Sequence, residues 1–96
     1  MQLPTPSAVH QPERQRFIVT VDGGVSVLDY RLVGTAVHIL HTEVPPALQG
    51  RGLAAALVQA ALAHARSQGW RVRPVCSYVQ AYMQRHPETI DLLESR

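Results

Sequence analysis

The segment from Val44 to Ala54 carries the most specific chemical signal in the chain. It reads Val-Pro-Pro-Ala-Leu-Gln-Gly-Arg-Gly-Leu-Ala, so a β-like run stops at two prolines and a glycine turn leads into an Ala- and Leu-rich stretch. Proline cannot continue a strand ladder, whereas glycine lets backbone N–H groups approach a ligand closely. A helix that begins here would direct unpaired N–H groups toward the turn. The segment therefore predicts a backbone site for a phosphate-bearing ligand.

Two side chains just before this segment could accept a proton. His41 and Glu43 lie two positions apart in a β-like run, so we expect them to share one face of a strand, with Thr42 and Val44 on the other face. An imidazole or a carboxylate is suited to general base chemistry, directly or through a water molecule. The alternative is that one of them is an ordinary surface residue.

Two further candidates lie in the last third of the chain. Cys76 is the single cysteine, and Tyr82 lies four residues before His86. A thiol can serve as a nucleophile and a phenol as a proton donor, but a cysteine is also a common small apolar filler, and a tyrosine ring can simply pack on a sheet. Tyr78 precedes Tyr82 by about one helical turn and should share its face.

Hydrophobic patterning predicts the elements that position these residues. Residues 16–21 and 25–32 are β-rich and flank a turn at Asp22-Gly23-Gly24, which indicates a hairpin. We expect further strands at 35–44 and 71–76, and helices at 52–68 and 78–85, with Gly69 ending the first helix and Ser77 capping the second. The order β, β, β, α, β, α makes the last strand parallel to the third.

The bulk composition fits one globular domain. The chain has 96 residues, 46% hydrophobic and 17% charged, and a formal charge of +2. Residues 1–12 contain three prolines and are predicted to form a flexible leader, which leaves 13–96 as the domain. One cysteine and the lack of a signal-like or membrane-length apolar stretch favour the cytoplasm. No His or Cys spacing indicates a metal site, and neither a membrane nor a nucleic acid is expected as a partner.

These segments, in their order, resemble the acyl-CoA-dependent N-acetyltransferases of the GNAT superfamily. Gln49, Gly52 and Ala54 fit the superfamily signature Q/R-x-x-G-x-G/A. Together with residues 41–46, Pro74-Val75-Cys76, and Tyr82 followed by His86-Pro87, they resemble the small YjdJ-type branch over about residues 14 to 90. A lone glycine motif would be weak, whereas four matched segments in sequence order are more specific.

The resemblance implies an α/β (α+β) fold, a minimal form of the GNAT fold with a mixed, mostly antiparallel sheet and a central βαβ crossover. Two parallel strands would splay apart between Val44 and Cys76, and the pantetheine arm of acetyl-CoA would enter there. The residues expected to bind the cofactor are Val44, Leu48, Gln49, Gly50, Arg51, Gly52, Leu53, Ala54, Cys76, Tyr82 and Arg85. The amides of residues 48–54 would hold the pyrophosphate.

For catalysis, Glu43 or His41 could accept the amine proton, and the resemblance assigns Tyr82 to the departing thiolate. Cys76 stands where many GNAT enzymes have an asparagine, and it would line the site or carry the acetyl group transiently. The helices that usually complete the substrate side have no counterpart here, so the acceptor site would be open or completed by another subunit, in a monomer or a homodimer.

The sequence thus favours an acetyl-CoA-dependent N-acetyltransferase that uses direct transfer to an unidentified amine, on a small molecule or a protein. The alternative is a regulatory acyl-CoA-binding module with little turnover. A small RNA- or protein-binding domain would lack interleaved aromatic and basic residues and would leave the Val44–Ala54 segment unexplained.

Overall fold

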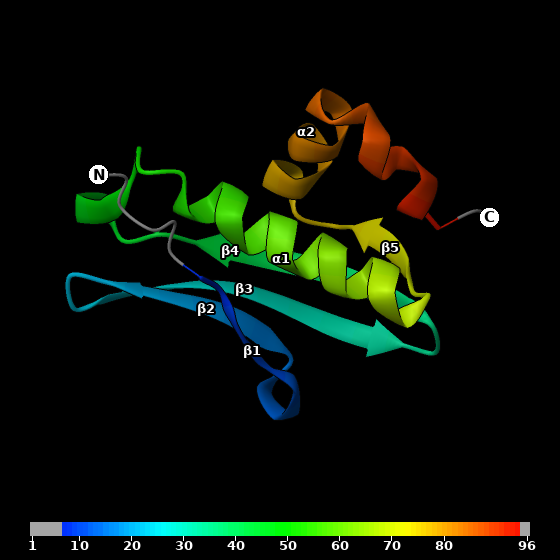
Figure 1. Ribbon diagram of the computed structural model, residues 1–96, viewed down its shortest axis with the longest axis horizontal. Coiled ribbons are helices and arrows are strands. Elements are labelled where there is room, and N and C mark those ends of the chain that lie inside the picture. The colour runs from blue at the N-terminus through cyan, green and yellow to red at the C-terminus, as the bar shows by residue number, and fades with distance from the viewer. Residues whose placement is uncertain (1–6, 95–96) are drawn as a thin grey trace.

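A computed structural model describes residues 7–94 as a five-stranded sheet with two helices on one face. Figure 1 shows the longer helix running along the sheet and the shorter helix above it. The strands are β1 (Val9–Gln11), β2 (Arg16–Val21), β3 (Gly24–Val33), β4 (Ala36–Glu43) and β5 (Arg71–Pro74). The helices are α1 (Leu53–Gln68) and α2 (Ser77–Arg85), and short 3-10 turns occupy η1 (Pro12–Arg14), η2 (Pro46–Leu48) and η3 (Pro87–Leu92).

The strands lie side by side in sequence order. The first four are antiparallel neighbours, and β5 pairs in parallel with β4 after the chain crosses over through α1. A parallel pair requires such a long connection, whereas antiparallel neighbours need only tight turns. The predicted mixed sheet with a central βαβ crossover is confirmed.

The strand β1 corrects the prediction of a leader over residues 1–12. Val9 pairs with Ile18 and Gln11 with Arg16, so the chain joins the sheet before residue 13. Residues 1–6 of the predicted leader lie outside the described residues. A three-residue strand that ends just before Pro12 has no periodicity to reveal it, and tertiary contacts decide its conformation.

The helix α1 forms where its apolar periodicity predicts. Its buried side chains form one stripe that faces the sheet: Leu53, Leu57, Val58, Ala61, Leu62 and Ala65. Gly69 ends the helix with φ 72°, and its N–H reaches the carbonyl groups of Ala65 and Arg66. Glycine adopts this left-handed conformation without a Cβ penalty, so it stops the helix as expected.

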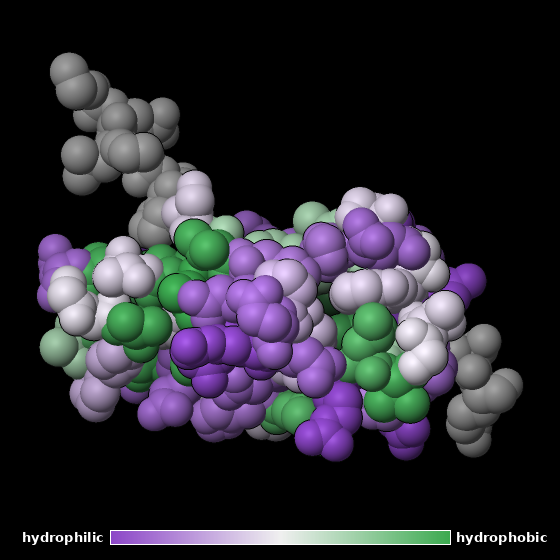
Figure 2. Space-filling view, turned by 90° about the horizontal axis from the view of Figure 1, so that it is seen from below, coloured by the Kyte–Doolittle hydropathy of each residue, from purple (hydrophilic) through white to green (hydrophobic). Residues whose placement is uncertain are grey.

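The hydrophobic core fills the space between the helices and one face of the sheet. Phe17, Leu28 and Ile39 contribute from three neighbouring strands, and Val79 and Met83 contribute from α2. No helix of the described residues covers the opposite face. Figure 2 shows the molecule from below, away from both helices, where a hydrophilic band crosses the middle of the surface between hydrophobic areas.

A β-bulge in β4 reverses which residues face α1. Asp29 pairs with His41 and Tyr30 pairs with Ile39, so Leu40 is an extra residue without a partner in β3. Before the bulge, the odd-numbered Ile39 faces the core; beyond it, Thr42 pairs with the buried Leu28 and faces the same side. The side chains of His41 and Glu43 therefore lie on the uncovered face.

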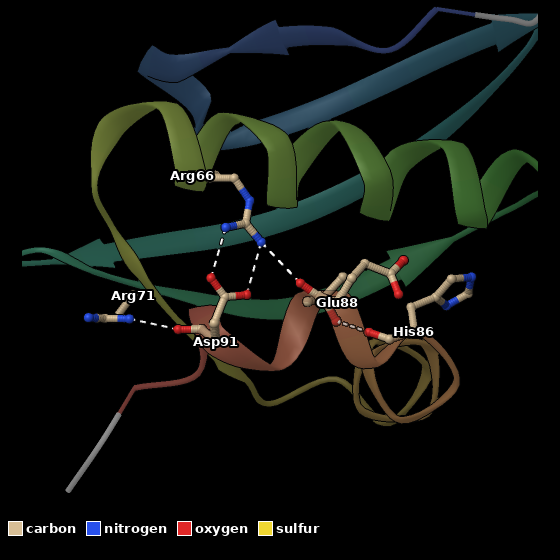
Figure 3. A network of polar contacts seen from close by, with 6 residues as sticks. Arg66, Arg71, His86, Glu88 and Asp91 are labelled. Atoms are coloured by element: carbon tan, nitrogen blue, oxygen red, sulfur yellow. Dashed lines mark hydrogen bonds and ion pairs between the residues drawn. The ribbon is translucent and has the colours of Figure 1, made fainter.

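The C-terminal turn η3 is fastened to α1 and β5 by arginines (Figure 3). Arg66 donates to both carboxylate oxygens of Asp91, at 2.8 and 3.0 Å, and to the carbonyl of Glu88 at 3.2 Å. Arg71 donates to the Asp91 carbonyl at 2.7 Å. This forked contact fixes the segment that follows α2.

An aromatic cluster holds β1 against the sheet and α1. The His10 ring stacks on Phe17 with a centroid distance of 4.3 Å, and its Nε2 lies 2.6 Å from the Tyr30 hydroxyl. The His64 ring of α1 lies 4.4 Å away. Burial lowers the pKa of His10 below 6.5, and the nearby His64 lowers it further, against a smaller opposite effect of Glu13.

We expect acid to loosen this cluster. Because the folded pKa of His10 lies below its unfolded value of 6.5, the unfolded chain binds more protons, and stability falls as the pH drops from about 6.5 through the folded pKa. Thermal denaturation between about pH 7.5 and 5 should show a shallower pH dependence for His10→Gln than for wild type. His41→Gln, outside the cluster, is the control; equal slopes for all three proteins would contradict the assignment.

Candidate functional site

The strands β4 and β5 separate at their C-terminal ends. Their ladder stops at the pair Ile39 and Pro74, and the Ile39 carbonyl accepts the N–H groups of Val75 at 3.0 Å and Cys76 at 2.9 Å. Beyond this point β4 continues to Glu43 while the other chain turns into α2. The result is a wedge at the place where the sequence predicts one, although it opens earlier, directly after Ile39.

The loop after β4 has the backbone conformation that its glycines suggest. Gly50 and Gly52 have φ angles of 84° and 76°, and a Cβ built on either would meet no atom within 4 Å. The first backbone hydrogen bond of α1 runs from the Ala56 N–H to the Gly52 carbonyl. The amides of residues 53–55 therefore have no acceptor within the helix, and they lie at the positive end of its dipole.

A cavity of about 430 Å³ joins the wedge to this loop. Its lining includes most of the residues predicted to bind the cofactor, together with Thr42 and Tyr78: Thr42, Val44, Leu48, Gln49, Gly50, Gly52, Leu53, Ala54 and Tyr78. Arg51, Cys76, Tyr82 and Arg85 are not among the lining residues. The cavity places backbone donors at one end and the open strand edge at the other.

The β2–β3 hairpin supports the loop from outside. Arg51 donates to the Asp22 carboxylate at 2.8 Å, so its side chain leaves the cavity. A Cβ on Gly24 would lie 2.7 Å from Leu48 Cδ1, which shows how closely the hairpin packs on the buried Leu48. The Gln49 amide donates to the Val44 carbonyl at 3.2 Å and ties the loop to the end of β4.

Cys76 lies at the start of α2, in contact with β4. Its Sγ is 3.6 Å from the Thr42 hydroxyl, across the narrow end of the wedge. Partial burial would raise the pKa of the Cys76 thiol, but hydrogen bonds from the Val79 N–H, the Thr42 hydroxyl and the Tyr78 N–H outweigh it and lower that pKa below 9.0. The strand predicted over 71–76 in fact ends at Pro74, and Cys76 rather than Ser77 precedes the helix.

Tyr78, rather than Tyr82, reaches the cavity at the wedge. Tyr82 is only 8% exposed, and its ring stacks on His86 with a centroid distance of 3.9 Å. It lines a second cavity of about 280 Å³ between the helices, together with Arg85, and Tyr78 borders both cavities. Burial, and then the neighbouring Tyr82, raise the pKa of Tyr78, so its phenol stays protonated at neutral pH.

His41 and Glu43 share a face, as predicted, and lie on the other side of β4 from the cavity. Their side chains are 58% and 71% exposed, and His41 Nε2 lies 3.5 Å from Glu43 Oε1. No motif in the sequence singled out Thr42 for chemistry. Strand alternation puts Thr42 and Glu43 on opposite faces of β4. Only the bulge shows that Thr42 is the residue on the α1 side.

Two negative observations concern residues 7–94. No three or more His, Cys, Asp or Glu side chains come together in a way that could hold a metal ion. None of the helices has both the length and the apolar character needed to cross a membrane.

Comparisons with known proteins give the family. A family model described as GCN5-related N-acetyl-transferase matches residues 16–92. The chain is 37% identical over 81 residues to Protein NATD1 of Gallus gallus, covering 81% of this chain and 74% of that protein. The human NATD1 protein is also 37% identical, with 72% of it covered, and the Danio rerio protein is 32% identical, with 74% covered.

A solved structure shares the fold. The solution structure of a GCN5-like protein from Staphylococcus aureus superimposes with a TM-score of 0.73 at 21% sequence identity, covering 98% of this chain and 93% of that one. The family match spans strands β2 to β5, the glycine loop and both helices. The chain therefore belongs to the GCN5-related N-acetyltransferase family, in agreement with the resemblance found in its sequence.

Proposed function

We propose that this protein binds acetyl-CoA and transfers the acetyl group to an amine. The observation that carries the proposal is the continuous cavity, which joins a left-handed glycine loop at the start of α1 to the separated ends of β4 and β5. Family membership gives the reaction class, and the cavity offers a suitable place for the cofactor.

The loop and wedge fit the two chemically distinct parts of acetyl-CoA. The open space at Gly50 and Gly52 and the free amides of residues 53–55 suit a pyrophosphate. The unpaired edge of β4 beyond Ile39 suits the amide-containing pantetheine arm, as an added strand would. Arg85, in the second cavity, would lie near further phosphate. The bound cofactor would supply a thioester as the acetyl donor.

The reaction needs two proton transfers, one from the attacking amine and one to the departing sulfur, and residues on opposite faces of β4 would carry them out. From the uncovered face, Glu43 would accept the proton of the attacking amine, with His41 as its neighbour at 3.5 Å. From the cavity side, the protonated Tyr78 would donate to the departing sulfur. Tyr82, predicted for that role, would instead support Tyr78 from the adjacent helical turn.

The second candidate is an acyl-CoA-binding module with slight turnover. The exposure of Glu43 favours it, because a general base is most effective in an enclosed site with a raised pKa. This candidate shares the cofactor site, so binding experiments alone do not separate it from the enzyme.

We expect Gly52→Val to abolish cofactor binding. A β-branched side chain at φ 76° would distort the loop and cover its amides. Wild type should gain thermal stability with acetyl-CoA, whereas Gly52→Val should gain none. The matched control is Gly34→Val, which has a similar left-handed φ of 62° in the β3–β4 turn and should keep the gain. If acetyl-CoA stabilises Gly52→Val as much as wild type, the glycine loop is not part of the cofactor site.

Glu43→Gln should lower amine-dependent thiol release from acetyl-CoA by about 10²- to 10⁴-fold, the usual contribution of a general base. Stabilisation by acetyl-CoA should be unchanged, because Glu43 lies off the cavity. Glu88→Gln alters an exposed carboxylate in η3 and serves as the control. If wild type is stabilised by acetyl-CoA but releases no thiol with any amine, the binding-module candidate replaces the enzyme.

Cys76 should react with iodoacetamide at a lower pH than an ordinary cysteine, because its pKa is lowered. Thr42→Val removes one hydrogen bond to the sulfur and should shift the pH profile of alkylation upward, whereas Thr20→Val, on an exposed residue of β2, should leave it in place. Acetyl-CoA should slow the reaction in wild type. If neither Thr42→Val nor acetyl-CoA changes the alkylation rate, the assignment of Cys76 to the wedge is wrong.

A further inference from the structure

The uncovered face of the sheet is ordered into rows by the strand register. One row runs across four strands through Val9, Ile18, Val27 and Glu43. The next contains Arg16, Asp29 and His41, and it includes an ion pair of 3.5 Å between Arg16 and Asp29. Directly opposite residues on neighbouring strands point to the same face, so each row is a set of adjacent side chains.

A third row contains only basic side chains. Arg31 of β3 pairs with His38 of β4, and His38 pairs with Arg73 of β5. We call these three residues the basic row. The buried Val72 points to the core, so Arg73 points to the uncovered face, where Arg31 and Arg73 are exposed. Strand spacing places these two arginines roughly 10 Å apart.

The basic row has no acidic partner among the described residues. The closest carboxylate on the same strand, that of Asp29, contacts Arg16, and Glu43 contacts His41. Arg71, the other arginine of β5, donates to the Asp91 carbonyl at the sheet edge. The charges of Arg31 and Arg73 lie on either side of His38, two strands apart, and repel each other with no carboxylate between them. A bound anion would offset that repulsion.

The basic row lies close to the proposed chemistry. His38 and Arg73 precede the last ladder pair, Ile39 and Pro74, after which the wedge opens. Glu43 lies five residues beyond His38 on the same strand and the same face, so about 15 Å separates the two. A molecule that lies along β4 could touch the basic row with one part and Glu43 with another.

We propose that the basic row binds acidic side chains of a polypeptide acceptor whose reacting amine lies at the Glu43 end of β4. This inference rests on the proposed function, because it names the class of acceptor for the same site. The polypeptide follows from the distance: the amine and carboxylate of a single amino acid cannot span about 15 Å, whereas an extended chain covers it in four or five residues. It also follows from the open, broad face, which suits an extended chain.

The first test is binding without acetyl-CoA. Two fluorescent peptides, each with blocked ends and a single lysine, carry either glutamates or glutamines four and five residues from the lysine, on both sides. Anisotropy at low salt should show the glutamate peptide binding about tenfold more tightly, with the preference lost at about 0.5 M salt. The variant Arg31→Gln/Arg73→Gln should lose the preference. The control Arg14→Gln, an exposed arginine of η1, should keep it.

A second measurement separates ligand binding from a structural role. Without peptide, Arg31→Gln/Arg73→Gln should unfold at the same or a higher temperature than wild type, because it removes like charges and breaks no ion pair of the described residues. In turnover, the variant should raise the KM of the glutamate peptide about tenfold and leave kcat and stabilisation by acetyl-CoA unchanged.

The outcomes separate this inference from the proposed function. Equal acetylation of both peptides, or an acidic preference that persists in Arg31→Gln/Arg73→Gln, would overturn the basic row as an acceptor site while the enzyme stands. A lower unfolding temperature for that variant, or faster acetylation of small anionic amines than of the glutamate peptide, would also overturn the inference. Binding of the glutamate peptide through the row without thiol release would overturn the enzyme and leave the row as a peptide site.

Discussion

The site depends on one backbone constraint, the point at which the parallel ladder between β4 and β5 stops. The Ile39 carbonyl accepts the N–H groups of both Val75 and Cys76, so the chain after Pro74 turns away and begins α2 instead of following β4. Strand β4 is held on its other edge by β3 as far as Glu43. One edge of β4 is therefore open beyond Ile39 while the other edge stays paired with β3, and the proposed cofactor arm would pair at the open edge.

The bulge at Leu40 gives the open strand two chemically different faces. Without the extra residue, strand alternation would carry Ile39, His41 and Glu43 on one face, and the last two would point toward α1. With it, Thr42 meets Cys76 on the cavity side, and His41 and Glu43 meet solvent. One inserted residue thus places the Glu43 carboxylate on the face of β4 opposite the cavity, which Tyr78 borders from α2.

Local signals in the sequence predicted the hairpin, α1 and the glycine loop, because turns, caps and apolar periodicity depend on neighbouring residues. The features that escaped prediction depend on distant ones. The strand β1 forms because it pairs with β2. The side chain of Arg51 points away from the cavity because it binds Asp22. The choice of Tyr78 over Tyr82 depends on how α2 lies against α1 and β4, which places Tyr82 in the second cavity beside α1 and Tyr78 at the wedge. Spacing within a helix cannot decide between two residues that share a face.

The uncovered face limits how this protein could select an acceptor. Within the described residues no helix or loop covers β4 on that face, so there is no enclosed pocket there. Neither the shape of a pocket nor buried hydrogen bonds can therefore distinguish one amine from another. Charge still acts over an open surface, although each exposed contact contributes only about 1 kcal/mol or less. Two aligned arginines, with His38 between them, can together provide a selectivity that one cannot, and this selectivity must fall with salt. The unpaired row beside the wedge is therefore better explained by an acceptor that supplies the missing negative charge than by the stability of the sheet.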